Sequence, residues 1–207
     1  MNDNNIRSPR DEINSELDKY FTNEINYHPN IKENDNNNNI QNSSDIHNEL
    51  FSFIVNNNFK EFKLKFTKNI DLVNKLSIKG FYLLHFSCFL KKNNFISFLI
   101  KNNASPYKKD SIGKTAMHYS ILSGNKSTVN LLFSLNCDFN VKDFDGDSPF
   151  HYAVSNNDEN IIDVLIKNNA DPFIKNNNNF TPLNYSIKNQ NIYKKIKLYS
   201  EKYKSKN

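Results

Sequence analysis

Four segments of this chain align at a spacing of 33 residues, and this period constrains the fold more than any other feature. One column of the alignment holds glycine or asparagine, and a second column holds histidine or asparagine. The two columns are Gly80, Gly113, Gly146 and Asn179, and then His85, His118, His151 and Asn184. A fixed period of this length indicates a repeat array, in which each unit packs only against its neighbours.

The residues within each unit predict a turn followed by two helices. Gly113 and Gly146 follow short polar runs, where a turn requires a residue that accepts a positive φ. A hydroxyl residue such as Ser148 can then cap a helix, and Pro149 suits the first helical position. Further along each unit, apolar residues recur at helical spacing, as in 161–166. These stripes must pack against the neighbouring units, because one helix pair cannot bury its apolar side alone.

The aligned columns resemble the ankyrin-repeat family, whose signature is T-P-L-H-x-A within a repeat of about 33 residues. Residues 148–153, SPFHYA, are the most similar copy, and the turns at 110–113 and 143–146 also match. The resemblance covers residues 46–203. It implies an all-α ankyrin-repeat solenoid of stacked helix-turn-helix units with β-turn tips, divided at about 46–79, 80–112, 113–145, 146–178 and 179–203. It also implies that the repeated histidines hydrogen-bond between adjacent repeats and order the turns.

Residues 1–45 differ from the array in composition. They are rich in asparagine and acidic residues, so the sequence predicts a disordered acidic tail before the repeats. Within it, residues 11–25 place Ile13, Leu17, Tyr20, Phe21 and Ile25 at helical spacing. This segment is either an amphipathic helix that docks on the array or on a partner, or a fluctuating stretch.

The opposite end of the chain is basic, with seven lysines and one glutamate in residues 186–207. It could attract an acidic partner, a membrane surface or nucleic acid, or it could simply be a soluble cap. The chain has few arginines and no base-stacking motif, so specific binding of nucleic acid is not expected.

The sequence offers no catalytic chemistry. It has no Gly-rich phosphate loop, nucleophile elbow or zinc motif, and the histidines are spread one to a repeat instead of converging. The alternating Asp143, Asp145 and Asp147 lack the downstream glutamate of a calcium loop. Cys88 and Cys137 occupy columns of apolar residues and look like small core residues, which favours buried thiols in a reducing compartment. We therefore expect no enzyme activity, cofactor or metal, no transmembrane segment, and an intracellular location, cytoplasmic or nuclear.

The resemblance implies that a partner meets the turn tips and the exposed side of the first helix in each pair. The expected tip residues are Ser111, Ile112, Lys114, Phe144, Asp145, Asp147, Asn177, Asn178 and Phe180. The expected helix residues are Phe89, Leu90, Leu122, Ser123, Ser155 and Asn156. The apolar members among them could form one patch, or the core could absorb some of them.

The leading hypothesis is a monomeric, non-catalytic protein-interaction module, either an adaptor or an inhibitor of another protein. A second hypothesis is a regulatory subunit of an enzyme carried on another chain. A third, an enzyme with a hidden site, would need a convergent pocket of ionisable groups.

Overall fold

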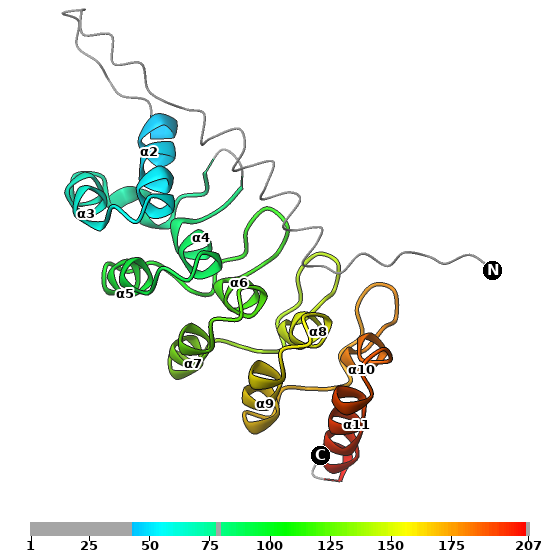
Figure 1. Cartoon of the computed structure of the whole chain (residues 1–207). Helices are drawn as coiled ribbons and strands as arrows, with labels where there is room; N and C mark the ends of the chain where they lie inside the picture. The colour runs from blue at the N-terminus through cyan, green and yellow to red at the C-terminus, as the bar shows by residue number, and fades with distance from the viewer. Residues whose placement is uncertain (1–42, 78–79, 206–207) are drawn as a thin grey trace, which may run out of the picture.

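The computed structural model describes residues 43–77 and 80–205, and it shows a curved stack of helix pairs (Figure 1). Residues 1–42, with most of the predicted tail, lie outside the described part. The helices are α2 (Ser43–Val55), α3 (Phe59–Thr67), the 3-10 helix η1 (Ile70–Asn74), α4 (Leu83–Phe89), α5 (Asn93–Lys101), α6 (Ala116–Leu122), α7 (Lys126–Ser134), α8 (Pro149–Ser155), α9 (Glu159–Lys167), α10 (Pro182–Tyr185) and α11 (Gln190–Lys204). No strand occurs in these described residues, so the predicted all-α solenoid is confirmed.

Two rows of helices form the stack, and the turn tips extend from one side of it (Figure 1). The first helices α4, α6, α8 and α10 lie in one row, and the second helices α5, α7 and α9 lie in the other. Each first helix contacts the next, from α4 to α6, from α6 to α8 and from α8 to α10. This arrangement repeats one packing geometry along the chain, as the period predicts.

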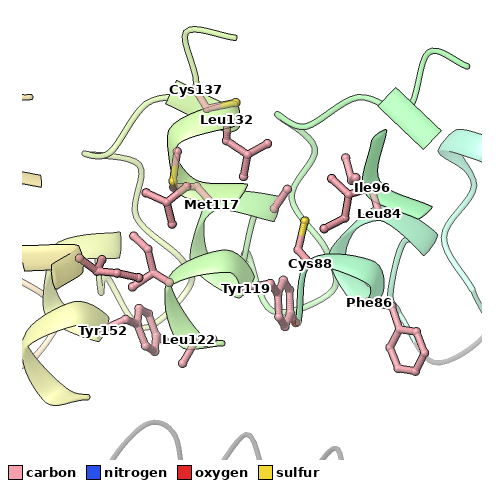
Figure 2. Packing of buried hydrophobic residues seen from close by; sticks show 14 of the residues in the cluster. Leu84, Phe86, Cys88, Ile96, Met117, Tyr119, Leu122, Leu132, Cys137 and Tyr152 are labelled. Atoms are coloured by element: carbon pink, nitrogen blue, oxygen red, sulfur yellow. The ribbon is translucent and has the colours of Figure 1, made fainter. Parts of the chain in front are cut away.

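The core runs through the stack as repeated layers of apolar side chains (Figure 2). Leu84, Met117 and Phe150 occupy one column of the alignment, and all three are buried. Most of each predicted stripe on the second helices is buried in the same way, as Leu165 of α9 shows, although Phe133 of α7 is 40% exposed. Burial of these layers supplies the main driving force for folding, because apolar surface is removed from water at every repeat boundary.

The two ends of the array depart from the common pattern. Asn57 and Lys91 end equivalent first helices with similar φ angles of 55° and 57°, although they lie 34 residues apart. At the other end, α10 is only four residues long. The N-cap of α11, Asn189, follows the N-cap of α9, Asp158, by 31 residues instead of 33. α2 begins at Ser43, before the expected boundary at residue 46. The repeat is therefore strict only in its central units.

The contact between neighbouring tips explains why glycine occupies this column of the alignment. All its members have positive φ, from 62° at Asn179 to 86° at Gly80, so backbone conformation alone does not require glycine. A Cβ on Gly146 would lie 2.7 Å from the backbone nitrogen of Asn177, and one on Gly113 would lie 2.6 Å from that of Phe144. No further tip covers Asn179 in the described residues. Glycine is therefore needed where the next tip packs against it.

This explanation predicts that the same substitution destabilises the protein at one glycine and has little effect at another. Gly146→Asn should destabilise the protein by about 1–3 kcal/mol, because the new side chain must displace the Asn177 backbone. Gly124→Asn should change stability by less than about 0.5 kcal/mol. A Cβ there meets only the Asp158 side chain, at 3.1 Å, and Asn157 already adopts the equivalent positive φ. Chemical denaturation of both variants would check this, and equal losses would contradict it.

Candidate protein-binding surface

Each central turn tip is built around one buried carboxylate or amide. Asp143 Oδ1 accepts hydrogen bonds from the backbone N–H groups of Asp145, at 3.0 Å, and Asp147, at 2.9 Å. The same pair of bonds recurs at Asp110 and at Asn176. A side chain that satisfies two backbone donors fixes the turn without help from a partner. The tips are therefore ordered before anything binds to them.

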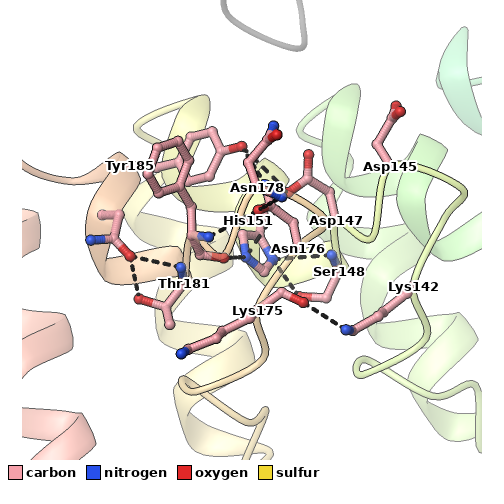
Figure 3. Close-up of polar contacts among 12 residues, drawn as sticks. Lys142, Asp145, Asp147, Ser148, His151, Lys175, Asn176, Asn178, Thr181 and Tyr185 are labelled. Carbon is pink, nitrogen blue, oxygen red and sulfur yellow. Dashed lines mark hydrogen bonds and ion pairs between the residues drawn. The ribbon is translucent and has the colours of Figure 1, made fainter.

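Hydrogen bonds join each tip to the next. The backbone N–H of Phe144 donates to the carbonyl of Ile112 at 3.2 Å, and that of Asn177 donates to the carbonyl of Asp145 at 3.0 Å. Two lysine side chains also cross between repeats: Lys109 Nζ donates to the Lys142 carbonyl, and Lys142 Nζ donates to the Lys175 carbonyl (Figure 3). Successive tips thus form one continuous edge.

The histidines connect the helix starts to the following repeat. His151 Nδ1 accepts from the Ser148 backbone N–H at 3.1 Å, and its Nε2 donates to the Phe180 carbonyl at 2.9 Å (Figure 3). His118 makes the equivalent bonds to Thr115 and to the Asp147 carbonyl. Desolvation by burial lowers the pKa of both imidazoles to about 4, so they are neutral at pH 7. The predicted cross-repeat role is confirmed for these two residues.

His85 departs from this pattern. Its ring is fully buried and stacks on Tyr119, with 5.4 Å between the ring centroids. The ring lies near the Lys108 backbone, but its nitrogens reach no partner with hydrogen-bond geometry among the described residues. Tyr82 precedes this helix where the other repeats have Thr or Ser, so no short hydroxyl side chain sits beside the ring. Burial lowers the pKa of His85 to about 3.

A buried ion pair lies beneath the central tips. Lys114 Nζ lies 2.9 Å from Asp143 Oδ2, and both side chains are almost fully buried. The Tyr152 hydroxyl donates to the same carboxylate oxygen of Asp143. Burial alone would raise the pKa of Asp143, but Lys114 and Tyr152 outweigh it and hold that pKa below its ordinary value. The pair joins two successive turn tips, because Lys114 follows the turn at 110–113 and Asp143 begins the turn at 143–146.

Asp147 has the opposite electrostatic environment. Its Oδ1 accepts from Asn176 Nδ2 at 2.8 Å (Figure 3). Burial, with the nearby charges of Asp143 and Asp145, raises the pKa of Asp147 to about 6 despite that bond. The Asp147 carboxylate is therefore ionised at pH 7 in a site that favours its neutral form.

Four of the predicted contact residues do not form accessible surface. Lys114 turns inward to Asp143, and Asp147 turns inward to Asn176. Leu122 is only 2% exposed, and Asn156 Nδ2 reaches the carbonyl of Leu122 at 3.3 Å. Ser123 is also buried, and its hydroxyl donates to the Ser120 carbonyl. Of the two alternatives for the apolar residues, one patch or partial absorption by the core, Leu122 follows the second, and the patch is interrupted there.

The other predicted residues remain accessible to different degrees. At the tips, Phe144 is 63% exposed and Phe180 is 44% exposed. Polar residues exposed beside them are Ser111, Asp145, Asn177 and Asn178. Ile112 is half-buried, as are the helix residues Phe89, Leu90, Ser155 and Asn156. The accessible surface is thus a row of tips with two projecting aromatic rings, beside a first-helix face that changes from apolar to polar along the array.

Sequence reasoning missed the polar network and one exposed residue. The pair Lys114–Asp143 and the bond Asn176–Asp147 both join positions 29 residues apart, as do the histidine bonds. This common offset was the signal that could have revealed them. Ile187, in a column of buried residues, is 60% exposed in the last repeat.

A family model described as ankyrin repeats (3 copies) matches residues 40–143 and 135–206. The chain belongs to the ankyrin-repeat family. Members of this family generally serve as protein–protein interaction modules, typically without catalysis of their own. No curated protein matches the chain.

Two further features bear on function. Within the described residues, no helix has the length and apolar character needed to span a membrane. The same residues contain no cluster of three or more side chains suited to holding a metal ion.

Buried neutral histidines should make the array sensitive to acid. Because the folded-state pKa values of His118 and His151 are about 4, below the ordinary 6.5, their contribution to stability is full above pH 6.5 and declines as the pH falls towards 4. His151→Asn should keep the bond to Ser148, as Asn184 does with Thr181, but leave the Phe180 carbonyl without its donor. We expect a loss of about 1–3 kcal/mol at pH 7.5 that shrinks by pH 5. Denaturant melts at both pH values would check this, and parallel losses would contradict it.

Asp147→Asn should stabilise the protein at neutral pH. The raised pKa of about 6 means that ionised Asp147 opposes folding above that pH, and that this penalty disappears as the pH falls towards 4. The asparagine can still accept the bond from Asn176. The melting temperature should therefore rise at pH 7.5 and change little at pH 4. Asp145→Asn removes a charge from an exposed neighbour and should give a smaller gain; equal gains would show that burial of Asp147 is not the cause.

Proposed function

We propose that this protein is a non-catalytic interaction module that holds a partner protein across its turn tips and the accessible side of its first helices. The observation that carries the proposal is the exposure of Phe144 and Phe180 on an ordered edge. Exposed aromatic rings are common anchors in protein interfaces, because their burial gains much free energy at a small entropic cost.

The surroundings of these rings fit the composition of an interface. Asp145, Asn177 and Asn178 are exposed on the same tips and supply charge and amide groups. A centre of aromatic residues with a polar rim is the usual arrangement in transient complexes. The hydrogen bonds between tips add preorganisation, so a partner would not have to order this edge on binding.

The half-buried face of the first helices extends this surface. Phe89 and Leu90 make its N-terminal part apolar, whereas Ser155 and Asn156 make its C-terminal part polar. We expect the partner to place apolar side chains near α4 and hydrogen-bonding groups near α8. Within this proposal, the protein acts as an adaptor or as an inhibitor of its partner. The alternative is a regulatory subunit, which would co-purify with the activity of an enzyme carried on another chain.

Matched substitutions would test this surface. Phe144→Ser with Ile112→Ser should weaken partner capture by about thirtyfold, which corresponds to about 2 kcal/mol for the loss of an interface anchor. Leu64→Ser is the control: Leu64 is 53% exposed on α3, away from the tips, and its change should leave capture intact. The measurement is quantitative affinity purification from the native cell, with the melting temperature of each variant recorded. Equal capture by both variants would refute the proposal.

A further inference from the structure

Nothing in residues 43–77 and 80–205 covers the stacking face of the last repeat. In the repeats before it, Cys88, Ile121 and Val154 occupy one column of the alignment and are fully buried. Ile187 occupies the same column and is 60% exposed. This position is buried wherever another helix pair follows, so its exposure marks a face built to be covered.

A shallow hollow lies around Ile187. It is lined by Leu183, Asn184, Ile187, Gln190 and Tyr193, from α10 and α11. Leu183 is half-buried, whereas its counterparts Leu84, Met117 and Phe150 in the preceding repeats are buried. The equivalent faces in the middle of the stack are covered by the next first helix. An amphipathic helix is therefore the structure that suits this hollow.

The charge around this face selects an acidic occupant. Lys188, Lys194 and Lys197 are exposed on α11 and the turn before it. Lys195, by contrast, turns back to the preceding repeat, where it lies 2.9 Å from Asp163 and 3.5 Å from Glu159. A second copy joined through the same face would bring the exposed lysines of two chains together, which is unfavourable.

We propose that residues 11–25 of the same chain dock on this face. Their apolar residues recur at helical spacing, and the segment carries five acidic side chains and one lysine. A helix of this sequence would place the stripe of Ile13, Leu17, Tyr20 and Phe21 on Ile187 and its apolar neighbours. Its acidic residues would then meet the lysines of α11. The proposal does not depend on the binding of a partner at the tips.

The chain is long enough for this contact. Residues 26–42 connect the segment to α2, and 17 residues can extend to about 60 Å. Four steps from the first repeat to the last, at about 10 Å for each helix-to-helix step, amount to about 40 Å. The segment can therefore reach the last repeat of its own chain.

Disulfide formation in the full-length protein would test the proposal. One variant combines Asn14→Cys with Gln190→Cys in the hollow, and its matched control combines Asn14→Cys with Glu61→Cys on α3. Glu61 is exposed and much nearer to the tail along the chain, so an undocked tail should join it faster. The natural thiols interfere little, because burial raises the pKa of Cys88 to about 12 and that of Cys137 to about 11.

The expected result is an intramolecular disulfide that forms at least about tenfold faster in the Gln190 variant than in the Glu61 control. Adding Ile187→Asp to the Gln190 variant should remove this preference. If Ile187→Asp lowers the melting temperature, Ile187→Ser replaces it in the same test. Faster or equal cross-linking of the control would overturn the proposal. Cross-linked dimers without the intramolecular product would overturn it in favour of a second copy, and an unchanged rate with both Ile187 variants would exclude the apolar contact.

Discussion

The close approach of each tip to the glycine of the preceding repeat is the constraint on which the rest of this structure depends. At Gly113 and Gly146 the next tip leaves no room for a Cβ, and the backbone hydrogen bonds between tips lie at the same place. This contact sets the spacing of the tips. Because the first helices start directly after the tips, it also sets the register in which α6, α8 and their apolar layers pack.

Polar groups beneath the tips make this register specific. The ion pair of Lys114 and Asp143 joins two successive tips, and the Nε2 bonds of His118 and His151 each join one repeat to the next. A slip between repeats would leave such groups buried without partners, which costs more than their pairing gains. Not every polar group is favourable, however. Ionised Asp147 opposes folding at neutral pH, although Asn176 partly compensates.

The repeated features were predictable from the sequence, and the irregular ones were not. Spacing and residue type indicated the glycine turns and the capped first helices, and the resemblance to ankyrin repeats implied the links made by His118 and His151. Neither could show that Lys114 and Asp147 turn inward. Their column holds Phe81 and Phe180 in other repeats, so the environment of this position depends on a partner in the next tip. The short α10 was equally hidden, because residues 188–191, KNQN, offer several residues able to cap a helix.

The aromatic rings at the tips and Ile187 on the last repeat are exposed for different reasons. Phe144 and Phe180 project from tips whose backbone is already satisfied by internal hydrogen bonds, so their exposure does not result from an unfinished fold. Ile187 is exposed because the repeat pattern stops beside it in the described structure. A partner at the tips would add contacts to a completed edge, whereas a helix on the last repeat would continue the stack. The same protein can therefore offer one surface to another molecule and the other to its own N-terminal segment, because the tips and the end of the stack lie on different sides of the array (Figure 1).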